Sequence, residues 1–168
     1  MQDEVDTAGF DEFVAGLDYP IFIVTAASAA GRDGCLVGFA TQTSIDPPRM
    51  LVCLSEANRT TAIARDADVL AVHVLDGREH PLAAHFGSQT GDEVDKLADV
   101  VWRPGLEGVP LLQDCPRRLV GRIIERYVLG DHIGHLLAPL EVEAAQETDS
   151  DDTLSFQDVT DIEAGHPA

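Results

Sequence analysis

The chain has 168 residues, 45% of them hydrophobic, and its 30 acidic and 11 basic residues give a formal net charge of -19. That hydrophobic fraction excludes a disordered chain, and the length suits a single domain. Residues 1–31 and 127–168 contain no Lys or Arg, while residues 32–126 are nearly balanced at -3, so a long nucleic-acid groove is excluded and any anion site must be local.

The N-terminal part predicts one helix followed by strands. Apolar residues recur at helical spacing over residues 10–17, and the sequence Asp18-Tyr19-Pro20 ends the helix. β-Branched and aromatic residues predict strands over 19–27, 35–44 and 50–54, the first two joined by a hairpin loop at 30–34. Gly34 and Gly38 weaken the second strand, which indicates a bulge or a close approach of another group to the backbone.

Strands and helices alternate in the remainder of the chain. We expect helices over 58–67, 80–86 and 92–98, and strands over 69–75, 118–128 and 132–142, the last two joined by a turn at Gly130-Asp131. The chain therefore divides into an N-terminal helical lead (1–18), one domain (19–142) and an acidic, mostly disordered C-terminal tail (143–168). The fold class is mainly β, an antiparallel barrel with helical decoration.

Targeting signals and metal motifs are not found in the sequence. The N-terminus lacks the basic and apolar regions of a signal peptide, and no apolar run reaches the length of a membrane helix, so we expect a cytoplasmic protein that does not bind a membrane. The three cysteines have no metal-ligand spacing and are expected to be buried free thiols. His132 and His135 would point to opposite faces of a strand, so no metal site is predicted.

Two segments could together bind an anionic ligand. Residues 41–44 place hydroxyl and amide groups on a strand that stops at Asp46-Pro47-Pro48. Asn58-Arg59-Thr60 then opens a helix, where Arg59 could add a charged contact to a phosphate. The alternative is that Asn58 or Thr60 only caps its own helix and that Arg59 is solvated. The fingerprints of Rossmann and P-loop nucleotide sites do not occur in the chain.

Ordered motifs over residues 15–142 resemble a known family. Gly34 to Pro48 follows the pattern G-x(9)-S-x-D-P-P, and an apolar strand, N-R-T and a buried strand come next. Asp95-Lys96-Leu97 matches a D-K-F motif, Trp102 is followed by Gly-x-Pro-Leu, and Gly130-Asp131-His132 matches a G-D-H motif. Because these motifs occur in the same order, the chain resembles the flavin reductase-like family of FMN-binding split barrels.

The resemblance implies a six-stranded, antiparallel Greek-key split barrel that forms a homodimer and binds FMN at the subunit interface. It implies that the flavin ring and ribityl chain contact a strand segment, that a helix start holds the phosphate and that one histidine lies near the nicotinamide. The matching positions are Gly38, Thr41, Gln42, Thr43 and Ser44 for the ring and chain, Asn58, Arg59 and Thr60 for the phosphate, and His132 for the nicotinamide.

The implied activity is an NAD(P)H-dependent flavin reductase that transfers hydride from NADH or NADPH to flavin N5, with FAD or a deazaflavin as possible replacements for FMN. Such a transfer needs no protein nucleophile, and the enzyme could supply a separate monooxygenase with reduced flavin. Gly38 and Phe39 stand where many members have a polar pair, and Leu97 replaces Phe. These departures leave open a flavin- or deazaflavin-binding redox protein without efficient nicotinamide turnover, or a barrel whose acidic ends bind a basic partner.

Overall fold

The computed structural model describes residues 5–144 and 153–166. Its main sheet has seven strands, and all neighbouring strands are antiparallel. In sheet order these are β2 (Gly31–Val37), β1 (Phe22–Ser28), β5 (Val69–Val74), β8 (Arg118–Leu129), β9 (His132–Glu143), β4 (Arg49–Ser55) and β3 (Ala40–Ser44). The helices are α1 (Thr7–Ala15), α2 (Arg59–Ala64) and α3 (His80–Ser88), with short 3-10 turns at Gly77–Glu79, Leu106–Gly108 and Phe156–Val159, and a small second sheet pairs β6 (Trp102–Pro104) with β7 (Pro110–Leu112).

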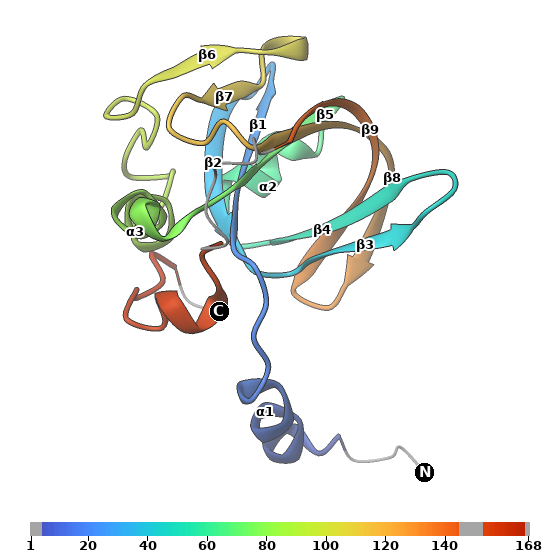
Figure 1. Ribbon diagram of the computed structural model, residues 1–168, viewed down its shortest axis with the longest axis vertical. Helices are drawn as coiled ribbons and strands as arrows, with labels where there is room; N and C mark the ends of the chain where they lie inside the picture. Colours follow the sequence, from blue (N-terminus) through green and yellow to red (C-terminus); the bar gives the residue numbers. More distant parts are fainter. Residues whose placement is uncertain (1–4, 145–152, 167–168) are drawn as a thin grey trace.

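The main sheet curls around one hydrophobic core. The long strands β8 and β9 curve over from the β1–β5 half to the β3–β4 half, while β2 and β3 remain at the two edges (Figure 1). Val24, Val52, Leu54, Leu70 and Leu137 are almost fully buried on the inner face, and α2 adds Ile63 to the same cluster. An open barrel of this kind is a split barrel, so the predicted mainly β split-barrel fold is confirmed.

The main sheet has seven strands instead of the expected six because the predicted strand 35–44 divides in two. Its first part pairs with β1 and its second part pairs with β4, and the chain turns the corner at Gly38 and Phe39. The carbonyl of Phe39 accepts a hydrogen bond from the Cys53 amide at 2.8 Å. A β-carbon at Gly38 would lie 2.8 Å from Cε2 of Tyr19, so this corner requires glycine, as the expected close approach to the backbone suggested.

The β1–β2 turn lies earlier than predicted. Ser28 pairs with Gly31, which leaves Ala29-Ala30 as the turn, and residues 32–34 belong to β2 rather than to a loop. The acidic residue in this stretch, Asp33, is buried because it faces Lys96 and accepts a hydrogen bond from Thr60. The β8–β9 turn is where the sequence predicts it, with Gly130 at a positive φ of 76°.

An outer layer covers β1 and β2 on the side away from the barrel core. Ile23 from β1 packs there with Phe86 from α3, Leu97 and Leu112. Helix α3 confirms the prediction for residues 80–86, but residues 92–98 form successive turns instead of the predicted helix. The Asp95 carboxylate accepts a hydrogen bond from the Leu97 amide at 3.1 Å, and such local side-chain bonds compete with helix formation.

The prediction of a mostly disordered tail is wrong for residues 153–166, here called the C-terminal segment. Leu154 and Val159 are only 3% and 7% exposed, because they join the outer hydrophobic layer. The Leu154 amide donates to the Leu75 carbonyl, and the Phe156 amide donates to the Tyr19 carbonyl. Residues 145–152 and 167–168 of the predicted tail lie outside the described residues.

The N-terminal helix stands apart from the barrel (Figure 1). Asp6 caps it by accepting a hydrogen bond from the Gly9 amide at 2.9 Å, and it has no buried residue. Helices long and apolar enough to cross a membrane are not found in the described part of the chain. All three cysteines are free thiols, as predicted, with Cys35 and Cys115 buried and Cys53 half-buried.

Candidate functional site

A groove of about 1000 Å³ opens where the β2–β3 corner meets the start of β9. The barrel contributes Gly38, Phe39, Cys53 and His132 to its walls. Its other side is lined by residues of helix α1, by Leu17 and by the C-terminal segment, among them Phe10, Val14, Phe156, Val159 and Ile162. The groove has the size and the largely apolar lining of a small-molecule site.

Four rings follow one another along this groove, and we call them the aromatic row. Phe156 stacks on Tyr19 with 4.9 Å between the ring centroids and 24° between the planes. Tyr19 is followed by Phe39 at 6.4 Å, and Phe39 by His132 at 5.1 Å. Because aromatic faces pack well against other planar rings, the row can hold a flat heterocycle.

Polar groups gather at the His132 end of the row. The His132 ring nitrogen Nδ1 lies 2.6 Å from Oδ1 of Asp131, and this hydrogen bond lowers the pKa of the Asp131 carboxyl. Ser55 and Asn58 line the same part of the groove. The Asn58 side chain does not cap α2, so the predicted capping alternative does not hold for it. Burial raises the pKa of the Cys53 thiol, which therefore stays protonated near neutral pH.

The structure brings three of the predicted site residues together in the groove, namely Gly38, Asn58 and His132. Thr41, Gln42 and Thr43 are exposed on the edge strand β3, and none of residues 41–44 lines the groove. Their polar groups bond locally, since Thr41 Oγ1 donates to the Gln42 carbonyl and Gln42 Nε2 donates to the Ser44 carbonyl, both at 3.2 Å.

Arg59 faces a second space on the other side of the α2 start, while Thr60 is buried beside it. This charged hollow has a volume of about 390 Å³ and is lined by Gly31, Arg32, Asp33, Arg59, Gly91 and residues 92–95. The Thr60 hydroxyl donates to Asp33 Oδ2 at 2.8 Å, so it is already engaged. The segment predicted to hold a phosphate therefore divides, with Asn58 in the groove and Arg59 in the charged hollow.

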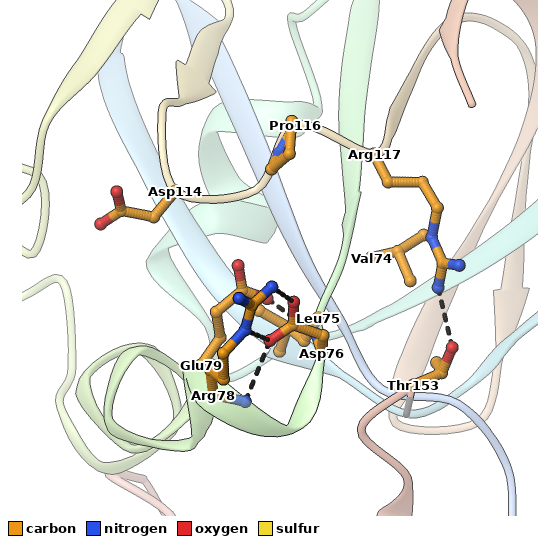
Figure 2. Close-up of a pocket in the computed structure, with 9 residues that line it drawn as sticks. All are labelled: Val74, Leu75, Asp76, Arg78, Glu79, Asp114, Pro116, Arg117 and Thr153. Carbon is orange, nitrogen blue, oxygen red and sulfur yellow. Dashed lines mark hydrogen bonds and ion pairs between the residues drawn. The ribbon is translucent and has the colours of Figure 1, made fainter. Parts of the chain in front are cut away.

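A third hollow, between the end of β5 and the start of β8, is too small for a nucleotide (Figure 2). Its volume is about 180 Å³, and both of its arginines bond to neighbouring groups. Arg78 forms an ion pair with Asp76 at 2.8 Å, and Arg117 donates to the Thr153 hydroxyl at 2.8 Å. The second of these bonds ties the C-terminal segment to the barrel.

Sequence reasoning missed three members of the aromatic row as site residues. Tyr19 was assigned to a strand, Phe39 was noted only as a departure from the polar pair, and Phe156 lay in the predicted tail. The available signal was the rarity of aromatic residues, which make up 5% of the chain. Isolated aromatic residues beside a glycine corner or in an acidic tail could have marked these positions.

The open barrel defines the chain as a split-barrel protein with an aromatic-walled groove. The family model described as the flavin reductase like domain matches residues 14–160. The chain therefore belongs to the flavin reductase-like family, and the matched range includes part of the C-terminal segment.

Curated relatives cover most of the chain. The reductase component of 4-hydroxyphenylacetate 3-monooxygenase from Pseudomonas aeruginosa is 27% identical over 141 residues, 83% of this chain and 83% of that protein. The FMN reductase (NADH) RutF of Bradyrhizobium diazoefficiens is 30% identical over 132 residues, 79% of this chain and 72% of that protein.

Solved structures support the same fold. The NADH:FAD oxidoreductase SgcE6 of Streptomyces globisporus aligns with a TM-score of 0.72 and 24% identity, covering 84% of each chain. An FMN-binding protein from Thermus thermophilus aligns with a TM-score of 0.73 and 21% identity, covering 86% of this chain and 78% of that one. At these identities the likeness shows the architecture of the barrel.

Proposed function

We propose that the protein is an NAD(P)H:flavin oxidoreductase that reduces FMN. The observation that carries this proposal is the groove of about 1000 Å³, in which an aromatic row ends at His132 and its partner Asp131. Membership of the flavin reductase-like family agrees with it. FAD and deazaflavins are kept as possible flavins, because both carry the same kind of flat ring system.

The residues present fit a flavin mononucleotide. Its ring would lie along the aromatic row beside Gly38, where a side chain is absent. Its ribityl chain would pass Ser55 and Asn58, which offer a hydroxyl and an amide at the groove wall. Its phosphate would extend past Asn58 and out of the groove to the α2 start, where Arg59 of the charged hollow would supply the positive charge. In this placement Thr60 contributes no hydroxyl, since that group bonds to Asp33.

The chain's part in the reaction is to orient two rings. When bound, a flavin supplies the ring that accepts a hydride at N5 from the nicotinamide. The Asp131 carboxylate accepts a hydrogen bond from His132 Nδ1 and thereby fixes the imidazole, so Nε2 is the nitrogen left for a ligand. Holding donor and acceptor in one geometry is itself a large source of rate enhancement.

The partner proposals follow from the same assignment. A reductase of this kind would deliver reduced flavin to a separate monooxygenase in the cytoplasm, the location expected from the sequence. A homodimer agrees with exposed apolar side chains on α1 and on the β8–β9 hairpin: Phe10 is 62% exposed, Phe13 69%, Val128 79% and Val142 61%. Analytical ultracentrifugation at several concentrations would test the dimer, and a monomer at all of them would refute it.

A second function is favoured by the position of Phe39. Its ring lies 5.1 Å from His132, in the space that a nicotinamide would need, and it stands where many family members have a polar residue. The protein would then bind a flavin or deazaflavin without efficient nicotinamide turnover. A Phe39→Ser variant distinguishes the two functions. If Phe39 blocks the nicotinamide position, the variant oxidises NADH faster than the wild type. Slower NADH oxidation by the variant favours the reductase.

The decisive experiment measures flavin binding and nicotinamide oxidation on the same purified protein. Fluorescence titration with FMN, FAD, riboflavin and a deazaflavin gives the affinities, and the absorbance of NADH and NADPH gives turnover. Asn58→Ala should weaken FMN binding, and His132→Gln should lower kcat/KM for the nicotinamide, each by about tenfold, the loss of one good hydrogen bond. Gln113→Ala, an exposed amide outside the groove, is the matched control. A wild type that neither binds flavin nor oxidises NAD(P)H refutes the proposal.

A further inference from the structure

A buried lysine lies beside the charged hollow. Lys96 is fully buried, and its Nζ is 3.6 Å from Oδ2 of Asp33, which is itself only 3% exposed. Among the described residues Nζ has no hydrogen-bond partner. Burying two charges is costly unless their placement serves a purpose, so this pair invites a functional explanation.

The pair connects three parts of the fold. Asp33 belongs to β2 and Lys96 to the turns at 92–98, and the Thr60 hydroxyl from α2 donates to Asp33 Oδ2 at 2.8 Å. The Lys96 carbonyl lies 2.7 Å from Nε2 of His85, which holds the turn region against α3. The first turn of α2 is therefore fastened to the Asp33 carboxylate.

Arg59 lies against the same cluster. A β-carbon at Gly91 would overlap the Asp33 carboxylate and would lie 3.0 Å from Arg59 Cδ, so the Gly91 backbone packs onto both side chains. The Arg59 guanidinium lies over Gly31, with Nη2 3.5 Å from the position of a β-carbon there. Among the described residues Arg59 forms no ion pair with Asp33.

Lys96 explains why the guanidinium and the carboxylate stay unpaired. An Asp33 carboxylate without a counter-ion would attract Arg59 strongly in this poorly solvated place. The Lys96 ammonium neutralises the carboxylate from the protein side, and the Thr60 hydroxyl satisfies one of its oxygens. Arg59 is thereby left available for a ligand.

We propose that Asp33, Lys96 and Gly91 are positioning residues that keep Arg59 available for the phosphate of the flavin, and that they set the preference for FMN over riboflavin. This inference rests on the proposed function. It adds that the charge of Lys96 acts through Arg59, without contact between Lys96 and the flavin. FMN and riboflavin differ only in the phosphate, so the ratio of their dissociation constants measures this effect.

The test compares variants that differ in charge balance, at one fixed low ionic strength. In Lys96→Met the unpaired Asp33 should capture Arg59, so the Kd for FMN rises by about tenfold while that for riboflavin stays within roughly twofold. Adding Asp33→Asn removes the attraction, and the double variant should recover the FMN preference of the wild type. Arg103→Met, which also removes one positive charge but breaks an exposed ion pair with Glu143 at 3.9 Å outside both the groove and the charged hollow, is the control.

Other outcomes refute the inference. Equal losses for both flavins in Lys96→Met would mean a merely structural role, and a double variant that keeps the loss would remove the charge argument. If Lys96→Met does not fold, the double variant, which leaves no unpaired buried charge, and Gly91→Ala replace it. Gly91→Ala should lower the FMN preference with all charges intact, and an unchanged preference there overturns the inference.

The wild type is measured first, because its result separates the two proposals. A protein that binds neither flavin refutes the proposed function. A protein that binds FMN and riboflavin equally well still binds a flavin, but it refutes the phosphate contact of Arg59 and with it the role of Lys96.

Discussion

Two buried histidines make the stability of the barrel depend on pH. Burial is the main cause that lowers the pKa of both His73 and His135 from the ordinary 6.5 to about 4, and the nearby charges of Arg118 and Arg126 contribute to the same shift. The unfolded chain takes up these protons near pH 6.5, whereas the folded chain takes them up only near pH 4. The stabilisation is therefore complete above pH 6.5 and is lost as the pH falls toward 4.

The size of the effect follows from the two pKa values. The difference between 6.5 and about 4 corresponds to about 3 kcal/mol for each histidine across the whole window, and to about 2 kcal/mol each at pH 5. Two histidines would remove about 4 kcal/mol at pH 5, a large part of the stability of a typical domain. Repulsion among the excess acidic residues weakens over the same range and acts in the opposite direction, so the comparison must be made between variants.

The variant that isolates the effect is His135→Leu. Neither ring nitrogen of His135 has a hydrogen-bond partner among the described residues, so leucine leaves no new unpaired group behind. Urea unfolding measures the free energy of unfolding at each pH. Between pH 7.5 and 5 this free energy should fall by about 2 kcal/mol less in the variant than in the wild type. His80→Gln, at a ring that remains partly in solvent, is the control. Parallel pH profiles for wild type and His135→Leu would refute the reasoning.

Three further substitutions test the packing of the barrel and of the C-terminal segment, each by urea unfolding at pH 7.5. His73→Leu strips the partners from two buried backbone groups, and we expect a loss of about 2–4 kcal/mol, in contrast to the small effect of His135→Leu. Gly121→Ala places a β-carbon 2.8 Å from Cβ of Leu137 and should lower the free energy of unfolding by about 1–3 kcal/mol. An unchanged free energy of unfolding would mean that β8 and β9 can move apart to make room for the methyl group. Leu154→Ala should lower the free energy of unfolding by about 2–4 kcal/mol because the side chain is buried. An unchanged free energy of unfolding would mean that the C-terminal segment does not pack against the barrel.

The strands were predictable because their signal is local. Runs of β-branched residues and the Gly130-Asp131 turn located β5, β8 and β9 closely. The corner at Gly38 and Phe39 was not predictable in this way, since residues 35–44 read as one continuous strand. At this corner the ring of Tyr19, a residue of another segment, lies against Gly38, and only the folded structure brings the two together.

The site was predictable through motifs but not through geometry. Asn58 and Arg59 are neighbours in the sequence and were assigned to one phosphate site, yet consecutive residues at a helix start point in different directions, so they reach different spaces. The aromatic row draws on residues 19, 39, 132 and 156, and no short sequence window contains two of them. The groove is thus a product of the tertiary structure.

The acidic C-terminal segment packs on the barrel although its composition predicts disorder. Two of its three acids have local partners: Asp158 accepts hydrogen bonds from the Ser155 amide and hydroxyl, and Asp161 lies 3.0 Å from His80. With these charges directed outward, the apolar side chains of Leu154 and Val159 are free to pack inward. A few spaced hydrophobic residues therefore suffice to dock a segment whose composition resembles a disordered tail. The acidic side chains of this segment point to solvent from the outer side of the groove wall. They therefore leave room for an anionic ligand that is neutralised by Arg59 alone.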